Sequence, residues 1–284
     1  MGALPHPRGS ANMAASISKN KDFFIIFTAF LNTTLKRADS LRVPLLPGRR
    51  PGCIVGETRS VSLWMGVQER LWLQPATEHM ELKPAAVQDI SAISRIHAAS
   101  WKAAYIGMIP QAYLDTLPET YWVEPFTKWF QSGELQAIIA WEGDTPAGCI
   151  SFGNPVSIPD SERKELPEGC GEVRSLYIHP DYMRRGYGKA LLQAAELSLR
   201  IRGFSGCCLY TLKENRIARA FYEKNGYFID GGTGSYEIAG KVITDLRYIK
   251  SLACPCPRRC KRHGDCIACT EAHKKKKNPR YCFR

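Results

Sequence analysis

Apolar residues recur with a regular period only in the middle of the chain, from about Met80 to Leu252. Short apolar or alternating runs predict strands, and apolar residues three to four positions apart predict helices. The expected strands cover residues 81–83, 137–141, 147–152, 172–178, 206–211, 227–229 and 242–249. The expected helices cover residues 90–101, 101–113 with an interruption at Pro110, 122–130, 190–201 and 215–225. Because strands and helices alternate along the chain, we expect an α/β layered domain.

The strand expected over residues 172–178 leads into a loop that contains glycine. Pro180 ends the strand, because proline cannot continue a ladder of hydrogen bonds, and Gly186 and Gly188 follow just before a helix. Unpaired backbone N–H groups and the positive end of the helix dipole make such a helix start suitable for binding phosphate. Basic side chains stand nearby at Arg184, Arg185 and Lys189.

Two common phosphate-binding motifs are excluded for this loop. A dinucleotide-binding loop has a third glycine at the position where this chain has Leu191. A P-loop has Ser or Thr after its lysine, whereas Ala190 follows Lys189 here, and Met183 stands where that motif has its first glycine. The loop therefore belongs to neither class.

The loop resembles the acetyl-CoA loop of the GNAT superfamily of N-acetyltransferases, which reads Gln/Arg-x-x-Gly-x-Gly/Ala after a strand ending in apolar-x-Pro. Pro180, Gly186 and Gly188 match, and Met183 departs from the first position. A second family signature, Asn-x-x-Ala-x-x-Phe-Tyr-x-x-x-Gly-Phe/Tyr, is matched over residues 215–227. The resemblance covers about 80–252. It implies the GNAT acyl-CoA N-acyltransferase fold, a central mixed β-sheet flanked by helices.

The resemblance also implies roles for individual residues. Backbone groups of Leu176 and Ile178 would hold the pantetheine arm of acetyl-CoA. The pyrophosphate would be held by Arg184, Arg185, Gly186, Gly188 and Lys189. Asn215 would contact the cofactor near the thiol, Tyr222 would protonate the departing thiolate, and Glu172 would act as general base, often through water.

Structural explanations stay open for several of these residues. Tyr222 could pack in the core beside Phe221, and Glu172 could be an ordinary exposed carboxylate of a strand. Other aromatic and imidazole side chains, on the helices that roof the acceptor site in the family, could equally be core residues. They are His97, Trp101 and Tyr105.

The function implied by the resemblance is transfer of acetyl from acetyl-CoA to a primary amine of a small molecule or peptide. The alternative from another class is a non-catalytic module that binds acyl-CoA or acts as a metal-tail adaptor. An enzyme that transfers a longer acyl group would differ only in the depth of its pocket. The residues that select the acceptor lie in variable loops, so the sequence does not identify the amine.

The net charge of +12 is unevenly distributed. Residues 80–250 hold 19 basic and 20 acidic side chains, so the excess of positive charge lies in the two ends. A nucleic-acid partner is therefore not expected for the core domain, although the basic tail could make weak contact. We expect no membrane partner and a cytoplasmic location.

Residues 1–79 are expected to be a disordered extension, or upstream sequence translated ahead of a true start at Met80. The apolar run over residues 23–31 resembles a short signal segment, so a targeting segment is the alternative. A run of nine residues is too short to span a bilayer.

The tail, residues 253–284, is rich in potential metal ligands. It contains six of the eleven cysteines and two histidines. Cysteine and histidine at such close spacing predict a tetrahedral zinc site. The expected ligands are Cys260, His263, Cys266 and Cys269, with His273 and Cys282 as alternatives. A redox-active cluster or a disordered tail remain open interpretations.

Overall fold

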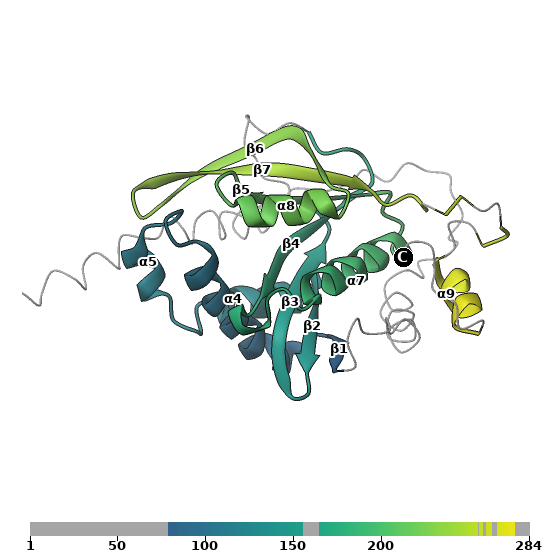
Figure 1. The fold of residues 1–284 in the computed structure, drawn as a ribbon, viewed down its shortest axis with the longest axis horizontal. Coiled ribbons are helices and arrows are strands. Elements are labelled where there is room, and N and C mark those ends of the chain that lie inside the picture. The colour runs from purple at the N-terminus through teal and green to yellow at the C-terminus, as the bar shows by residue number, and fades with distance from the viewer. Residues whose placement is uncertain (1–78, 156–164, 255, 258–259, 263–265, 276–284) are drawn as a thin grey trace, which may run out of the picture. The chain divides into compact units, whose positions relative to one another are not determined.

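The computed structural model describes residues 79–155, 165–254, 256–257, 260–262 and 266–275. Seven strands form one sheet in the order β1-β2-β3-β4-β5-β7-β6 (Figure 1). They are β1 Met80–Pro84, β2 Leu135–Glu142, β3 Thr145–Gly153, β4 Cys170–Ile178, β5 Gly206–Leu212, β6 Phe228–Ile238 and β7 Lys241–Ser251. All neighbouring strands are antiparallel except β4 and β5, which are parallel. The sheet is therefore mixed, as the resemblance implies.

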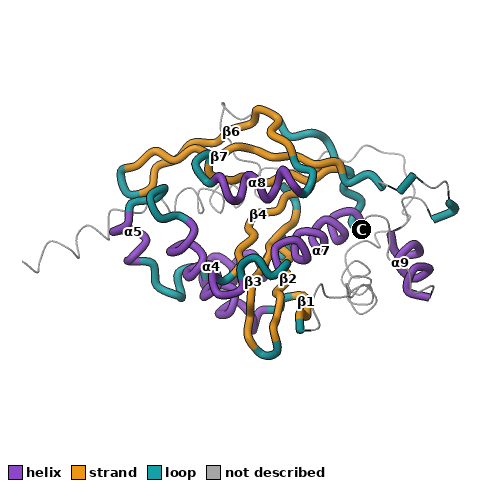
Figure 2. The backbone as a smooth tube through the Cα atoms, viewed as in Figure 1, coloured by secondary structure: helices purple, strands orange, loops and turns teal. Residues whose placement is uncertain are grey.

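Helices cover the sheet on both sides (Figure 2). The helices of the described residues are α4 Ile90–Ala104, α5 Gln111–Thr116, α6 Val123–Ser132, α7 Tyr187–Ile201, α8 Arg216–Lys224 and α9 Cys266–Lys275. Two short 3₁₀ helices, η1 Val87–Asp89 and η2 Pro180–Tyr182, precede α4 and α7. Helix α7 packs on β2, β3 and β4, and α4 packs on β3 and β4 with α6 beside it.

The two faces of the sheet are defined by alternation along the strands. In β2, Ile138 and Ala140 belong to a core that includes Leu191 and Leu192 of α7. Ile139 lies between them, is fully buried and stands outside that core. Successive side chains of a strand point to opposite faces, so Ile139 faces α4. We name these sides the α7 face and the α4 face.

The expected strands are found, and so are the expected helices except for the one over residues 101–113. That expectation is wrong for residues 105–110, which form turns between α4 and α5, and two strands also differ in length. Strand β6 continues to Ile238 and strand β7 begins at Lys241, so both strands are longer than the sequence predicts. Asp230, Gly231 and Gly232 resemble a turn in the sequence. In the structure the register of β6 against β7 shifts between Ile229 and Thr233, and this shift admits the glycines into a long strand.

The expected helix boundaries are also confirmed at three positions. Pro110 separates α4 from α5 and precedes the first residue of α5. The Asn215 side chain accepts a hydrogen bond from the Ala218 amide at 3.0 Å, so it caps α8. Gly226 follows α8 with φ of 84°, the left-handed conformation that glycine adopts without strain.

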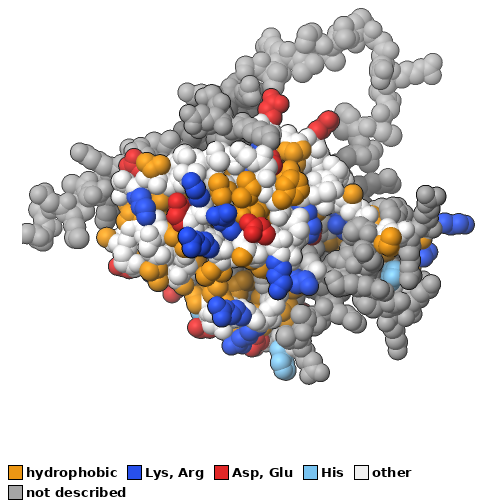
Figure 3. All heavy atoms as spheres, turned by 45° about the horizontal axis from the view of Figure 1, so that its top comes forward, with side chains coloured by type: hydrophobic (Ala, Val, Ile, Leu, Met, Phe, Trp, Pro, Cys, Tyr) orange, Lys and Arg blue, Asp and Glu red, His pale blue; other side chains and the backbone are white. Residues whose placement is uncertain are grey.

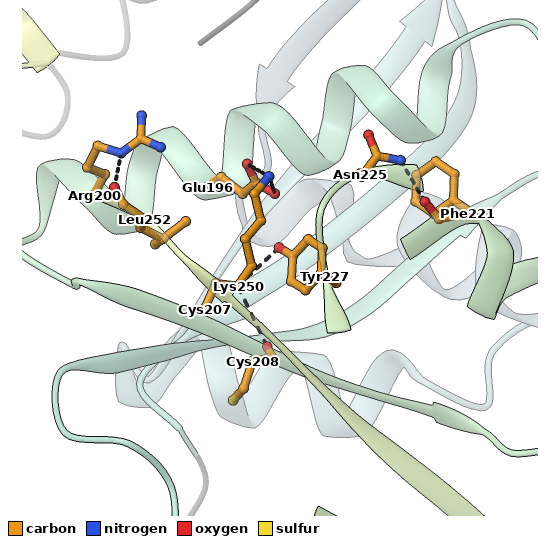
Figure 4. A network of polar contacts seen from close by, with 9 residues as sticks. All are labelled: Glu196, Arg200, Cys207, Cys208, Phe221, Asn225, Tyr227, Lys250 and Leu252. Carbon is orange, nitrogen blue, oxygen red and sulfur yellow. Dashed lines mark hydrogen bonds and ion pairs between the residues drawn. The ribbon is translucent and has the colours of Figure 1, made fainter. Parts of the chain in front are cut away.

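A polar network on the α7 face joins α7 to β5 and β7 (Figure 4). Lys250 Nζ lies 2.8 Å from both carboxylate oxygens of Glu196, which is a buried residue of α7. The Tyr227 hydroxyl donates to Cys207 Sγ at 3.4 Å, and the Lys250 ammonium lies 5.3 Å from the centre of the Tyr227 ring. These contacts pair a buried charge and connect the helix to the centre of the sheet.

Charges of both signs are interspersed on the face of the molecule drawn in Figure 3. This mixture agrees with the near-equal numbers of acidic and basic residues between positions 80 and 250. None of the helices in the described ranges is long and apolar enough to cross a membrane. The expectations for residues 1–78 lie outside the described residues.

Candidate active site

Strands β4 and β5 separate halfway along their length. Their pairing begins at Cys170 with Gly206 and ends, after four residue pairs, at Val173 with Leu209. Strand β4 continues to Ile178 and remains paired with β3, but β5 no longer accompanies it. The separation begins at Arg174, which is an extra residue of β4 at a shift in the β3–β4 register. One edge of β4 is therefore open from this point onward.

The open edge of β4 exposes main-chain hydrogen-bonding groups. The His179 amide donates to the Ala147 carbonyl of β3 at 2.9 Å, and main-chain groups alternate in direction along a strand. The amide and carbonyl groups of Leu176 and Ile178 consequently point away from β3. The Ile178 carbonyl accepts a hydrogen bond from Ser100 Oγ of α4 at 3.0 Å. The Ile178 amide and both groups of Leu176 are the ones suited to an extended ligand.

The loop after β4 delivers the N-terminus of α7. Gly186, the residue before the helix, has φ of 90°, and Arg184 has φ of 62°, so both residues are left-handed. The first amides of α7 have no partner within the helix and carry the positive end of its dipole. Lys189 is the third residue of α7. The loop and helix start thus have the geometry that the sequence predicts, and phosphate binding by them stays a prediction.

The second glycine of the loop has a packing role as well. A methyl group added at Gly188 would lie 3.4 Å from the Phe221 ring of α8 and 3.8 Å from Ile178. These are ordinary contact distances, so Gly188 marks the place where the start of α7 packs against α8 and the end of β4. The two family signatures meet at this contact.

The carboxylate of Glu142, which the sequence did not indicate, holds the loop that precedes α7. The Tyr187 hydroxyl donates to Glu142 at the end of β2, and burial raises the pKa of Tyr187 to about 12. Arg185 Nη1 lies 3.3 Å from Glu142 Oε1, and its guanidinium lies 5.2 Å from the centre of the Tyr182 ring. Glu142 stands 45 positions from Tyr187. No local motif predicts such a contact, since only the β2–β3 hairpin brings the two residues together.

Tyr222 lies on α8 and is 8% exposed. Its ring packs against Phe221, Tyr227 and Tyr248. Burial raises the pKa of Tyr222, and the nearby Tyr177 of β4 adds to this rise. Tyr222 is thus close to the open stretch of β4. Within the described part of the chain its hydroxyl makes no hydrogen bond.

Glu172 lies at the closed end of the gap, where β4 is still paired on both sides. It stands opposite Gly153 of β3 and Cys208 of β5. Burial lowers the pKa of the nearby Arg174, and the negative charge of Glu172 partly offsets this lowering. Glu172 is therefore a half-buried carboxylate three residues before Ser175, and its role as general base stays a prediction.

An aromatic cluster covers the α4 face of the same stretch of β4. Trp101 Nε1 donates to the Tyr177 hydroxyl at 2.9 Å, and the hydroxyls of Tyr105 and Tyr177 are 3.1 Å apart. Burial raises the pKa of Tyr177 to about 12, and Asp245 of β7 contributes to the rise for both tyrosines. Aromatic rings and a carboxylate thus lie together where β4 and β7 face α4.

The expected zinc ligands are only partly within the described residues. Cys260 and Cys269 are half-buried, Cys269 lies on α9, and His263 and Cys282 lie outside the described ranges. Among the residues that the structure describes, no group of three or more metal-binding side chains is placed to hold an ion.

Comparison with known proteins agrees with the two signatures and the fold. Residues 101–227 match the acetyltransferase (GNAT) family. Over these residues the chain is similar to the GNAT superfamily, and it is an acetyl-CoA-dependent N-acetyltransferase.

Several relatives carry the same activity in their names. A spermidine N1-acetyltransferase of Thermoplasma acidophilum is 26% identical over 157 residues, which is 55% of this chain and 92% of the relative. An uncharacterised N-acetyltransferase of Bacillus subtilis is 29% identical over 136 residues, 47% of this chain and 72% of the relative. A crystal structure of the PaiA N-acetyltransferase of Thermoplasma acidophilum with coenzyme A covers 61% of this chain and 98% of its own, with 22% identity and a TM-score of 0.48.

Proposed function

We propose that this enzyme acetylates a primary amine of a small cationic molecule of the polyamine type. The observation that carries the proposal is the gap between β4 and β5, which has the start of α7 at one end and the cluster of Tyr105, Tyr177 and Asp245 on its α4 face. Aromatic rings attract ammonium groups, and a carboxylate nearby adds Coulombic attraction. The relative named as a spermidine acetyltransferase supports the same class of acceptor.

The residues of the gap fit acetyl-CoA. Its pyrophosphate would meet the first amides of α7 together with Arg184 and Lys189, and its pantetheine amides would pair with the open edge at Leu176 and Ile178. When bound, acetyl-CoA supplies an activated acetyl thioester. Arg185 is already engaged by Glu142 and Tyr182, so its role would be to hold the loop as well as to add positive charge.

The chain's own groups assist the transfer in three ways. The acceptor nitrogen must be neutral to attack the thioester carbonyl, and Glu172 would take its proton through water. The bond between carbon and sulfur breaks as the new carbon–nitrogen bond forms, negative charge moves to sulfur, and the nitrogen releases a second proton to water to give the neutral amide. Tyr222 would donate a hydrogen bond to that sulfur. Because the pKa of Tyr222 is raised, its hydroxyl stays protonated and stabilises the thiolate without having to give up its proton.

Turnover with defined amines tests the proposal. The full chain would be incubated with acetyl-CoA and spermidine, free lysine or a short peptide, with released thiol and acetylated product both measured. We expect thiol release to depend on amine and to be fastest with spermidine. Binding of acetyl-CoA without thiol release on any amine would favour the non-catalytic alternative. Preference for the peptide would overturn the choice of a small acceptor.

The tail is proposed to bind zinc, with the protein located in the cytoplasm. Support comes from the spacing of Cys260, His263, Cys266 and Cys269, and a segment so short cannot build a hydrophobic core of its own. Elemental analysis of protein purified without added metal should find about one zinc, the number that four ligands hold. Absence of metal, with all six tail thiols open to alkylation, would leave an unstructured basic tail.

A further inference from the structure

A chain of polar side chains leads from inside α4 to the open stretch of β4. His97 of α4 is 2% exposed, and its Nδ1 lies 2.9 Å from the Ile93 carbonyl oxygen. Its Nε2 lies 3.3 Å from Ser175 Oγ of β4. Ser175 Oγ lies 2.6 Å from Ser151 Oγ of β3. None of these three side chains has a role in the chemistry described so far.

The surroundings of His97 fix which of its nitrogens carries the proton. A carbonyl oxygen only accepts hydrogen bonds, so Nδ1 must be the protonated nitrogen. Burial lowers the pKa of His97 to about 4, so the ring is neutral at neutral pH and Nε2 keeps its lone pair. The groups facing the ring are Cys149, Tyr177, Trp122 and Phe126. Burial raises the pKa values of Cys149 and Tyr177, so both are neutral as well.

The direction of every hydrogen bond in the chain follows from this tautomer. Nε2 accepts, so Ser175 donates its only hydroxyl proton to His97. The contact between the two serines then has Ser151 as the donor and Ser175 as the acceptor. Ser175 can therefore offer a ligand a lone pair and nothing else.

Ser175 lies in the open stretch of β4, where the proposed function places the reaction. It follows Arg174, the residue at which β4 separates from β5, and it shares the α4 face with Tyr177 two residues on. Leu176 lies between them, with its main-chain groups toward the gap. An amine that enters between the aromatic cluster and the thioester passes the Ser175 hydroxyl, which is half-buried.

We propose that Ser175 accepts a hydrogen bond from the attacking amine nitrogen, and that His97 and Ser151 are positioning residues that keep the Ser175 lone pair turned toward it. The inference rests on the proposed function. An N–H bond directed at Ser175 leaves the nitrogen lone pair free to point at the carbonyl carbon. The arrangement favours acceptors that still carry a hydrogen on the attacking nitrogen.

Kinetics on the full chain with spermidine and acetyl-CoA test the proposal. Ser175→Ala should raise the KM for spermidine and lower kcat/KM by about tenfold, the effect of one hydrogen bond, while the Kd for acetyl-CoA stays unchanged. Ser175→Thr keeps the hydroxyl and should restore most of the activity. His97→Phe preserves the ring packing but frees the Ser175 proton, so it should have a similar effect, and the double variant should be no worse than either single one.

A matched control is available on the same helix. Ser94 of α4 is also buried, and its hydroxyl donates to the Glu119 carbonyl. Ser94→Ala removes a buried hydroxyl away from the gap, so it should lower the melting temperature without changing the KM for spermidine. An equal rise in KM for Ser94→Ala would show that the effect of Ser175→Ala is merely structural.

The tautomer can be measured without any acceptor. In protein labelled with ¹⁵N at histidine, His97 should show a proton on Nδ1 and an unprotonated Nε2 from pH 6 to pH 8. A proton on Nε2 would contradict the hydrogen-bond directions assigned to His97, Ser175 and Ser151. Unchanged KM in Ser175→Ala, with turnover intact, would overturn the role of Ser175 alone. Absence of turnover in the unaltered protein would instead overturn the proposed function, and this inference with it.

Discussion

Tyr222 has a buried ring and lies close to Tyr177 in the open stretch of β4. Tyr222→Phe keeps the ring packing against Tyr227 and Tyr248. We expect kcat to fall by about 10²-fold or more, since a positioned donor is lost from the departing sulfur. The Kd for acetyl-CoA, measured by calorimetry, should remain within twofold. An unchanged kcat would show that Tyr222 serves only the core.

His97 links stability to pH, because its pKa in the folded protein is lowered to about 4 from an ordinary value of 6.5. The unfolded chain binds a proton at this residue between these two values, and the folded protein does not. Stability is therefore complete above pH 6.5 and falls as the pH drops toward 4, by up to about 3 kcal/mol. Urea unfolding of the unaltered protein and of His97→Phe at several pH values should show a shallower loss in the variant. If stability falls with pH equally in the unaltered protein and in His97→Phe, His97 is not the cause of the pH dependence.

Residues that act through local contacts were within reach of the sequence, whereas residues that act through distant ones were not. Asn215 and Gly226 could be placed because a cap and a left-handed helix end depend on a few neighbouring positions. Glu142 and Ser175 could not, because their partners Tyr187 and His97 lie 45 and 78 positions away. Only the strand order brings those pairs together.

At the scale of elements, Glu142 holds the start of α7 through Tyr187. Removing the carboxylate by Glu142→Ala leaves the buried Tyr187 hydroxyl without its acceptor and releases Arg185. We expect a loss of about 1–3 kcal/mol in the free energy of unfolding and weaker binding of acetyl-CoA. Glu142→Gln keeps an acceptor for Tyr187 and should lose less stability. Equal stability of both variants and the unaltered protein would exclude the anchoring role.

The long strand β6 depends on a glycine that makes room for a buried arginine. Arg247 is 1% exposed and donates to Asp230 at 2.7 Å and to the Glu165 carbonyl at 3.2 Å. A methyl group at Gly232 would lie 2.5 Å from Arg247 Nε. Gly232→Ala should therefore destabilise the fold by about 1–3 kcal/mol, the usual cost of overpacking.

Urea unfolding of a second glycine variant provides the control for that change. A methyl group at Gly206 would find its nearest neighbour, Cys170 Sγ, at 3.6 Å, which is an ordinary contact distance. Gly206→Ala should cost less than Gly232→Ala. If both variants unfold at the same urea concentration, the guanidinium can move aside and Gly232 is not required.

The strands and helices were predictable because apolar residues recur within each segment with a period of two residues in strands and 3.6 residues in helices. The ends of β6 were missed because glycine and serine resemble a turn, and the pairing with β7 overrides that local preference. The gap between β4 and β5 could not be derived from either strand alone. Its position follows from the extra residue Arg174 and from the register of two neighbouring strands.

At the scale of the whole molecule, the described domain contains both signatures and every group assigned to acetyl-CoA. Residues 80–252 expressed alone should therefore bind acetyl-CoA. A hundredfold excess over Kd should add about 2.7 kcal/mol to the free energy of unfolding and raise the melting temperature. Gly188→Glu, which places a negative charge and a side chain at the phosphate site, should abolish the rise. No shift in the unaltered domain, with a shift in the full chain, would mean that one of the ends takes part in binding.

The open edge of β4 makes acetyl-CoA resemble a missing strand. Where β5 turns away, the amides of Leu176 and Ile178 have no neighbouring strand, and the pantetheine arm offers amide groups of the same kind. Loading the enzyme would then complete the sheet across the gap. In hydrogen–deuterium exchange these amides should exchange quickly in the free protein and slowly with acetyl-CoA bound, while the amides of Cys170 to Val173 stay protected in both states.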